Sequence, residues 1–172
     1  MNNKMLVEMN TQIQRELESA YIYLSMAAYF DALNLPGFAQ WMKIQFQEEQ
    51  AHAMKFFDFI IDRGGKVTLQ AINQPPVEFK SPLDVFGKAL AHEEKISGHI
   101  NDLYALSMKE NDFASQPLLQ WFIEEQVEEE KSAGEIVETL KMIKGDATAL
   151  LILDRELGQR QLPSEVEGAQ EA

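Results

Sequence analysis

The stretch FAQWMKIQFQEEQAHAMKFFDF, residues 38–59, carries the strongest structural signal in this 172-residue chain. Its apolar side chains recur at steps of three and four residues, which places them along one face of an α-helix. Glu49 and His52 stand one helical turn apart in the middle of that face. Because an unpaired buried carboxylate costs several kcal/mol, this pair predicts a charged partner inside the core.

Three further helical patterns of similar length lie on either side of this stretch. The four helices are predicted at residues 4–34, 37–63, 81–110, and from shortly after the turn at 111–112 to 145. Each of the other three stripes is also broken once by a carboxylate, and these residues are Glu16, Glu93 and Glu129. The four helices therefore share one pattern: an apolar face, here called the seam, that is interrupted at one height by a carboxylate.

Connection lengths predict how the helices are arranged. The turns at residues 35–37 and 111–112 are short, so each joins an antiparallel pair. Residues 66–80 have no helical period, and at about 3.3 Å per extended residue they can travel the length of a bundle. We therefore expect an all-α four-helix bundle in which the second and third helices run parallel, joined by one long crossover.

The C-terminal part of the chain predicts one more element. Asp146 can cap a short fifth helix over residues 147–158. We expect residues 1–161 to form one domain and residues 162–172 to form a disordered acidic tail.

Counting residues from the turns tests whether the four carboxylates lie at one height. Glu93 and Glu129 are each about seventeen or eighteen residues from the turn between their helices, so their heights agree. Glu16 is about twenty residues before its turn and Glu49 about twelve after it. At 1.5 Å per residue this count predicts a mismatch of roughly 12 Å in the first pair.

Four carboxylates in one core need positive charge, and no Lys or Arg occupies the seam positions. A folded domain is stable by only about 5–15 kcal/mol, so four uncompensated buried charges would unfold it. Two divalent cations nearly neutralise four carboxylates. Oxygen ligands with one imidazole suit Fe(II), Mn(II) or Zn(II).

Composition excludes several classes of function. The formal net charge is −13, which disfavours nucleic acid and anionic membrane surfaces as partners. The chain has no cysteine, which excludes a disulfide framework, a cysteine-bound metal site and a thiol nucleophile. No secretory signal or membrane-spanning segment is visible, so we expect a cytoplasmic protein.

Three stretches carry a resemblance to a known family: Glu16 with YLSMA at residues 23–27, FQEEQAHAM at 46–54, and WFIEEQVEEE at 121–130. With these residues the chain resembles the non-haem ferritins of bacteria and archaea over residues 1–161. The resemblance implies a homo-oligomeric shell of 24 subunits with cubic symmetry. It also implies a ferroxidase that oxidises Fe(II) with O2 or peroxide and stores ferric mineral.

The resemblance also implies a role for each candidate residue. It assigns the first iron site to Glu16, Glu49 and His52, with Glu49 as the bridge. It assigns the second iron site to Glu93 and Glu129, with Gln126 beside it. It assigns a third, inner-surface iron site to Glu48, Glu125 and Glu128, with a share in Glu129. It places Tyr23 next to the centre.

The sequence departs from the di-iron pattern of related proteins at one point. Those proteins carry Glu-x-x-His on two helices, whereas the fourth helix here has Gln126-x-x-Glu129. We expect the second metal to be held less firmly, which suits iron as a substrate more than iron as a fixed cofactor. Gln50 stands where bacterioferritins place a haem-ligating methionine, so no haem is expected.

Several alternatives stay open at this point. Gln126 either ligates weakly or only donates a hydrogen bond, and Tyr23 is either a packed tyrosine or an electron donor. The acidic run at residues 124–130 is either a solvated face or part of the third iron site. The alternative functions are a di-iron oxidase or peroxidase with iron as fixed cofactor, and a structural bundle without catalysis.

Overall fold

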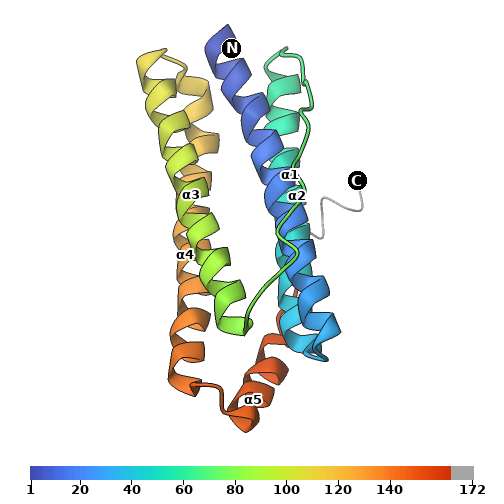
Figure 1. The fold of residues 1–172 in the computed structure, drawn as a ribbon. Coiled ribbons are helices and arrows are strands. Elements are labelled where there is room, and N and C mark those ends of the chain that lie inside the picture. Colours follow the sequence, from blue (N-terminus) through green and yellow to red (C-terminus); the bar gives the residue numbers. More distant parts are fainter. Residues whose placement is uncertain (164–172) are drawn as a thin grey trace.

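The computed structural model describes residues 1–163 as an all-helical chain. Four long helices lie side by side, and a short fifth helix lies across one end (Figure 1). The elements are α1 Asn3–Ala32, α2 Pro36–Asp62, α3 Pro82–Lys109, the 3₁₀ turn η1 Phe113–Ser115, α4 Gln116–Ile143 and α5 Ala147–Leu157. The predicted all-α bundle is confirmed. Most of the predicted acidic tail, residues 164–172, lies outside the described residues.

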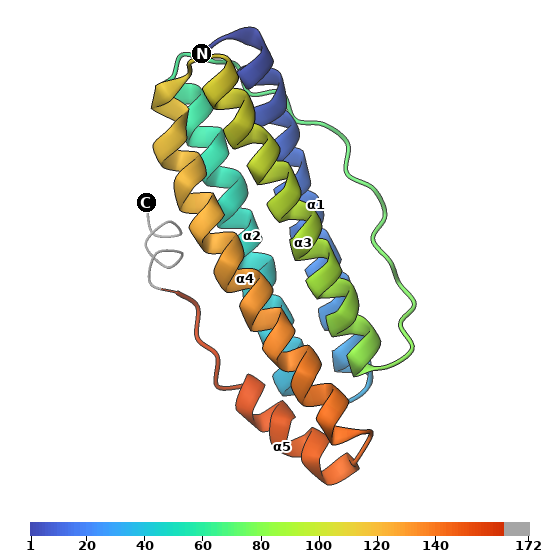
Figure 2. The same ribbon diagram turned by 90° about the vertical axis from the view of Figure 1, so that its left-hand side faces the viewer.

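The chain path is the predicted one, with a single long crossover. In the structure α1 packs along α2, and α3 packs along α4. Between α2 and α3 the chain forms no helix, and it runs along the outside of the bundle from one end to the other (Figure 2). This return places α2 and α3 parallel, so all four long helices cross the middle of the bundle.

The helix ends follow from local chemistry. The Ser81 side chain accepts a hydrogen bond from Asp84 N at 3.1 Å, which caps α3 at the predicted residue. Asp146 caps α5 in the same way. Gly64, after α2, has a φ of 66°, a left-handed conformation that glycine adopts without steric cost.

Helix α2 has no capping side chain of its own, and α5 supplies one. The Asp154 Oδ1 atom accepts hydrogen bonds from the backbone N–H groups of Gly37 at 2.8 Å and Phe38 at 3.0 Å. A Cβ atom at residue 37 would lie 1.6 Å from the Asp154 carbonyl oxygen. Only glycine therefore allows this close approach, which fixes α5 against the start of α2.

The core consists of two apolar clusters with a polar layer between them. One cluster, which includes Phe30, Phe38 and Phe86, lies toward α5. The other, which includes Phe56 and Phe122, lies toward the opposite end. On each long helix the buried carboxylate lies between the residues of the two clusters. The acidic level predicted from the stripes is therefore a layer across the whole bundle.

The predicted 12 Å mismatch between Glu16 and Glu49 is wrong. Glu16 lies sixteen residues before the end of α1, and Glu49 lies thirteen after the start of α2. The difference of three residues is about 4.5 Å of rise, which two glutamate side chains bridge. The sequence counts ran to the middle of the turn. Because α1 ends at Ala32 and α2 begins at Pro36, the count for Glu16 was about four residues too long and the count for Glu49 about one too short.

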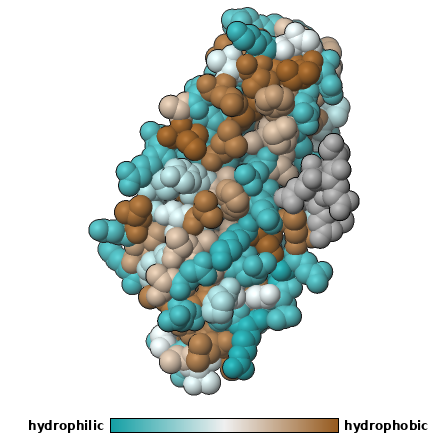
Figure 3. Space-filling model, turned by 90° about the vertical axis from the view of Figure 1, so that its right-hand side faces the viewer, coloured by the Kyte–Doolittle hydropathy of each residue, from teal (hydrophilic) through white to brown (hydrophobic). Residues whose placement is uncertain are grey.

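The surface contains many apolar side chains. They gather in groups among hydrophilic ones on the face shown in Figure 3. Leu69, Val77 and Met142 are among the large apolar residues that are more than half exposed. In residues 1–163 no helix is long and apolar enough to cross a membrane.

Candidate metal centre

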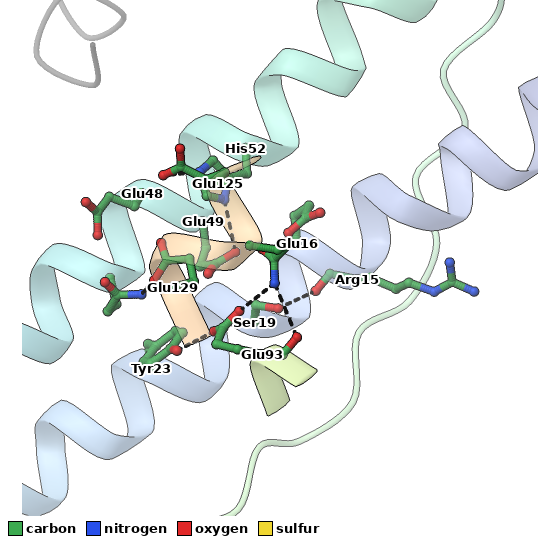
Figure 4. A network of polar contacts seen from close by, with 12 residues as sticks. Arg15, Glu16, Ser19, Tyr23, Glu48, Glu49, His52, Glu93, Glu125 and Glu129 are labelled. Carbon is green, nitrogen blue, oxygen red and sulfur yellow. Dashed lines mark hydrogen bonds and ion pairs between the residues drawn. The ribbon is translucent and has the colours of Figure 1, made fainter. Parts of the chain in front are cut away.

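The polar layer brings side chains from all four long helices to one point (Figure 4). Glu16 of α1 meets Glu49 and His52 of α2, and one ligand atom from each lies within 4.8 Å of the others. All three residues are at most 3% exposed. Two carboxylates and an imidazole at this spacing can hold one divalent metal ion.

The α2 residues reach this point because their spacing is one helical turn. The His52 Nδ1 atom lies 3.5 Å from Glu49 Oε2 on the same face of the helix. Edges of the Trp121 and Phe122 rings pack against the imidazole at 5.6 Å between ring centroids. This packing holds the histidine ring in place before any metal binds.

The α3–α4 half of the centre has an amide where the other half has an imidazole. The Gln126 Nε2 atom donates to Glu93 Oε2 and to the Glu93 carbonyl oxygen, both at 3.2 Å. The Tyr23 hydroxyl donates a short hydrogen bond to the other Glu93 oxygen. In the structure the Gln126 amide nitrogen and the Tyr23 hydroxyl thus both act as hydrogen-bond donors to Glu93.

Glu129 connects the centre to a second cluster. One ligand atom each from His52, Glu125 and Glu129 lie within 4.8 Å of one another. The His52 Nε2 atom is 3.9 Å from Glu125 Oε1. The two ring nitrogens of His52 therefore face different carboxylates, an arrangement that the sequence did not reveal.

An acidic pocket of about 390 Å³ opens beside this second cluster. Its lining contains the four glutamates that were predicted for a third metal site, which are Glu48, Glu125, Glu128 and Glu129. The structure therefore brings this predicted set together. Arg160 also lines the pocket, which the sequence did not indicate.

Burial raises the pKa of every carboxylate in the layer. Desolvation is the largest cause, and it raises the pKa of Glu16 to about 7 and that of Glu93 to about 8. It also raises the pKa of Glu49 far above its usual value, with repulsion from Glu93 and Glu16 as further causes. These shifts record first that the carboxylates are removed from water, and second that they lie close together without enough positive charge between them.

Burial has the opposite effect on the histidine. Desolvation, followed by repulsion from Lys55, lowers the pKa of His52 to about 3. The imidazole is therefore neutral at pH 7, the form in which a ring nitrogen can bind a metal. Because His52 is neutral, its close contacts with Glu49 and Glu125 do not compensate the negative charge of the carboxylates.

Two buried glutamines also belong to the centre. The Gln12 Nε2 atom donates to Glu16 Oε1 at 2.7 Å, and the Gln45 Nε2 atom donates to Glu129 Oε2 at 2.8 Å. Both glutamines are fully buried. Gln12 lies four residues before its partner Glu16, and this spacing is the signal that would have found it. Gln45 lies at a buried position four residues before Glu49, but its partner Glu129 is on α4, so sequence spacing could not have named that contact.

Comparison with known proteins agrees with this geometry. A sequence model of the ferritin-like domain matches residues 7–143. The chain belongs to the ferritin family. A bacterial non-heme ferritin of Bacteroides fragilis (strain 638R) is 40% identical over 159 residues, with 92% of this chain and 99% of the relative covered.

Solved structures show the same fold. An open-pore ferritin from the archaeon Archaeoglobus fulgidus is 50% identical, with a TM-score of 0.92, and covers 94% of this chain and 99% of its own. An engineered closed form of that ferritin has a TM-score of 0.93 at 50% identity, covering 95% of this chain and 99% of its own. The crossover bundle with a fifth helix is thus the ferritin fold, and membership in this family supports iron storage with iron oxidation as the function of the chain.

Proposed function

We propose that this ferritin oxidises Fe(II) to Fe(III) at the buried layer and stores the ferric product in a homo-oligomeric shell. The observation that carries the proposal is the layer itself. Four glutamates and one neutral imidazole are buried between two apolar clusters. Their hydrogen bonds come from neutral amide and hydroxyl donors, so metal cations are the natural source of compensating charge.

We assign the first iron to Glu16, Glu49 and His52, whose ligand atoms converge within 4.8 Å. We assign the second iron to Glu93 and Glu129, with Glu49 as the bridge and Gln126 as a positioning donor. Iron is the substrate here. The chain positions two ions and neutralises their charge, and the electrons pass from the two Fe(II) ions to O2 or peroxide.

We assign a third iron site to the acidic pocket, where Glu48, Glu125 and Glu128 join Glu129. Its contact with the centre through Glu129 gives a route for oxidised iron to leave. A shell of 24 chains is the assembly we propose, and the apolar groups on the surface are available to be buried between subunits. A cytoplasmic location remains a prediction.

Aerobic addition of excess Fe(II) to the metal-free protein tests this proposal. The products are separated by size-exclusion chromatography, and iron is measured in each fraction. Iron far above two ions per chain, eluting with a particle of several hundred kilodaltons, is the expected result. About two ions per chain with the excess precipitated would instead indicate an oxidase or peroxidase with iron as fixed cofactor. If no iron were bound, the proposal that the buried layer is an iron site would be refuted.

A further inference from the structure

Arg160, which follows α5, reaches into the acidic pocket that four glutamates line. Its Nη2 atom lies 2.7 Å from Glu48 Oε2, and the two side chains are 23% and 5% exposed. Its guanidinium carbon lies 4.5 Å from the centre of the Trp41 ring. A salt bridge and a stacking contact thus hold one positive charge in the pocket.

Only one of the two terminal guanidinium nitrogens of Arg160 makes a hydrogen bond to a described residue. The Nη1 atom is buried and has no hydrogen-bond partner among the described residues. Arg–carboxylate pairs are frequently bidentate, with two guanidinium nitrogens on one carboxylate, and the second hydrogen bond adds both energy and geometric specificity. The single contact with Glu48 is therefore of the kind that a stronger cation can replace.

We propose that Arg160 is the resident counter-ion of the acidic pocket and that a metal ion must displace it from Glu48 in order to bind there. This inference rests on the proposed role of the pocket as the third iron site. A guanidinium stays charged at all physiological pH values, so it competes with metal constantly. The competition keeps the pocket from holding iron tightly, which suits a place through which oxidised iron passes to the mineral.

The arrangement also links metal binding to the C-terminal segment. Arg160 lies three residues after the end of α5, and Pro163 lines the same pocket. Displacing the guanidinium from Glu48 therefore releases a contact that holds this segment against α2. Occupancy of the pocket and the position of the segment are coupled through one ion pair.

Terbium(III) titration of the metal-free oligomer tests the proposal, because Tb(III) prefers carboxylate oxygens and tryptophan sensitises its luminescence. The variants are Arg160→Gln, which removes the charge, and Arg160→Lys, which keeps it. Arg155→Gln is the matched control, since Arg155 is exposed on α5. Glu128→Gln identifies the signal of the pocket, since this residue lies outside the di-iron centre.

We expect R160Q to bind Tb(III) in the pocket at least tenfold more tightly than the native chain, with R160K and R155Q close to the native value. An equal or weaker affinity in R160Q overturns the proposal, because it would show that Arg160 builds the pocket instead of competing for it. A gain that survives in the R160Q/E128Q double variant also overturns it, because the gain would then arise elsewhere. The rate of Fe(II) oxidation is measured on terbium-free portions of the same preparations, and its absence in the native chain would reject the proposed function independently of the terbium result.

Discussion

The two halves of the metal centre lie at the same height in the bundle but differ in their donors. The α1–α2 half contributes two carboxylates and the neutral imidazole of His52. The α3–α4 half contributes Glu93 and Glu129, with Gln126 bound to Glu93 as a donor. Under the proposed assignment of two irons, equal burial with unequal ligands predicts that one ion is held more firmly than the other, as we expect where iron is a substrate that must enter and leave.

The largest effect is expected from removing the residue that both halves share. Glu49→Gln leaves neither ion with a bridging carboxylate, so the rate of Fe(II) oxidation should fall about a hundredfold or more. The metal-free protein should nevertheless melt at a higher temperature, because one buried carboxylate without a counter-charge is gone. Stopped-flow absorbance and calorimetry measure the two effects.

Glu94→Gln is the matched control for this change, since Glu94 is an exposed carboxylate. It should alter neither the rate nor the melting temperature. A normal oxidation rate in the Glu49 variant would mean that this layer is not the oxidation site.

Single substitutions should separate the two halves. His52→Ala removes the only nitrogen ligand of the first ion, so anaerobic Fe(II) affinity at the tighter site should fall about 10- to 100-fold. Gln126→Ala removes a donor and no ligand, so the weaker site should change only a few-fold. Calorimetric titration measures both, with His92→Ala as the control for loss of a histidine. Two equal affinities in the native chain would contradict the contrast between the halves.

The pKa shifts predict how pH acts on the metal-free protein. Glu16 and Glu93 have pKa values of about 7 and 8 in the fold and 4.5 when unfolded, so the folded chain binds more protons than the unfolded chain across this range. Its stability should therefore fall as pH rises. His52, with a pKa lowered from 6.5 to about 3, acts in the opposite sense only below about pH 6.5.

Scanning calorimetry between pH 6.5 and 8 checks this prediction. For each extra proton that the folded chain binds, the free energy of unfolding falls by about 1.4 kcal/mol per pH unit. A decrease of about 5 °C in the melting temperature is therefore expected. Added Zn(II) should cancel the decrease, because it replaces the protons. A melting temperature that is independent of pH would show that the carboxylates are ionised at no cost.

The smallest effect is expected from the hydroxyl group that supports the weaker half. Tyr23→Phe removes the hydrogen bond to Glu93, which should cost about 1 kcal/mol of stability and reduce the oxidation rate a few-fold. Tyr21→Phe is the control, because Tyr21 is 43% exposed. A loss of a hundredfold or more would show that Tyr23 supplies electrons to the reaction.

The positions of the helices and of the acidic layer could be predicted from the sequence. Helical stripes, the breaks at Gly64 and Gly145, and the caps at Ser81 and Asp146 located every helix end to within about two residues except the start of α4, where a 3₁₀ turn at Phe113–Ser115 comes first. These signals are local, since they depend on residues within one or two turns. The acidic layer was also predictable, because each of its four glutamates interrupts a stripe on its own helix.

Only the tertiary structure decided which side chains meet. The sequence assigned Gln126 either ligation or hydrogen bonding, and the fold set its amide against Glu93. It gave no sign that Asp154 caps α2 or that Arg160 enters the acidic pocket. Both contacts join residues more than a hundred positions apart. Periodicity determines which face of a helix is buried, whereas the partner across the core depends on how the helices are packed and where the last segment returns.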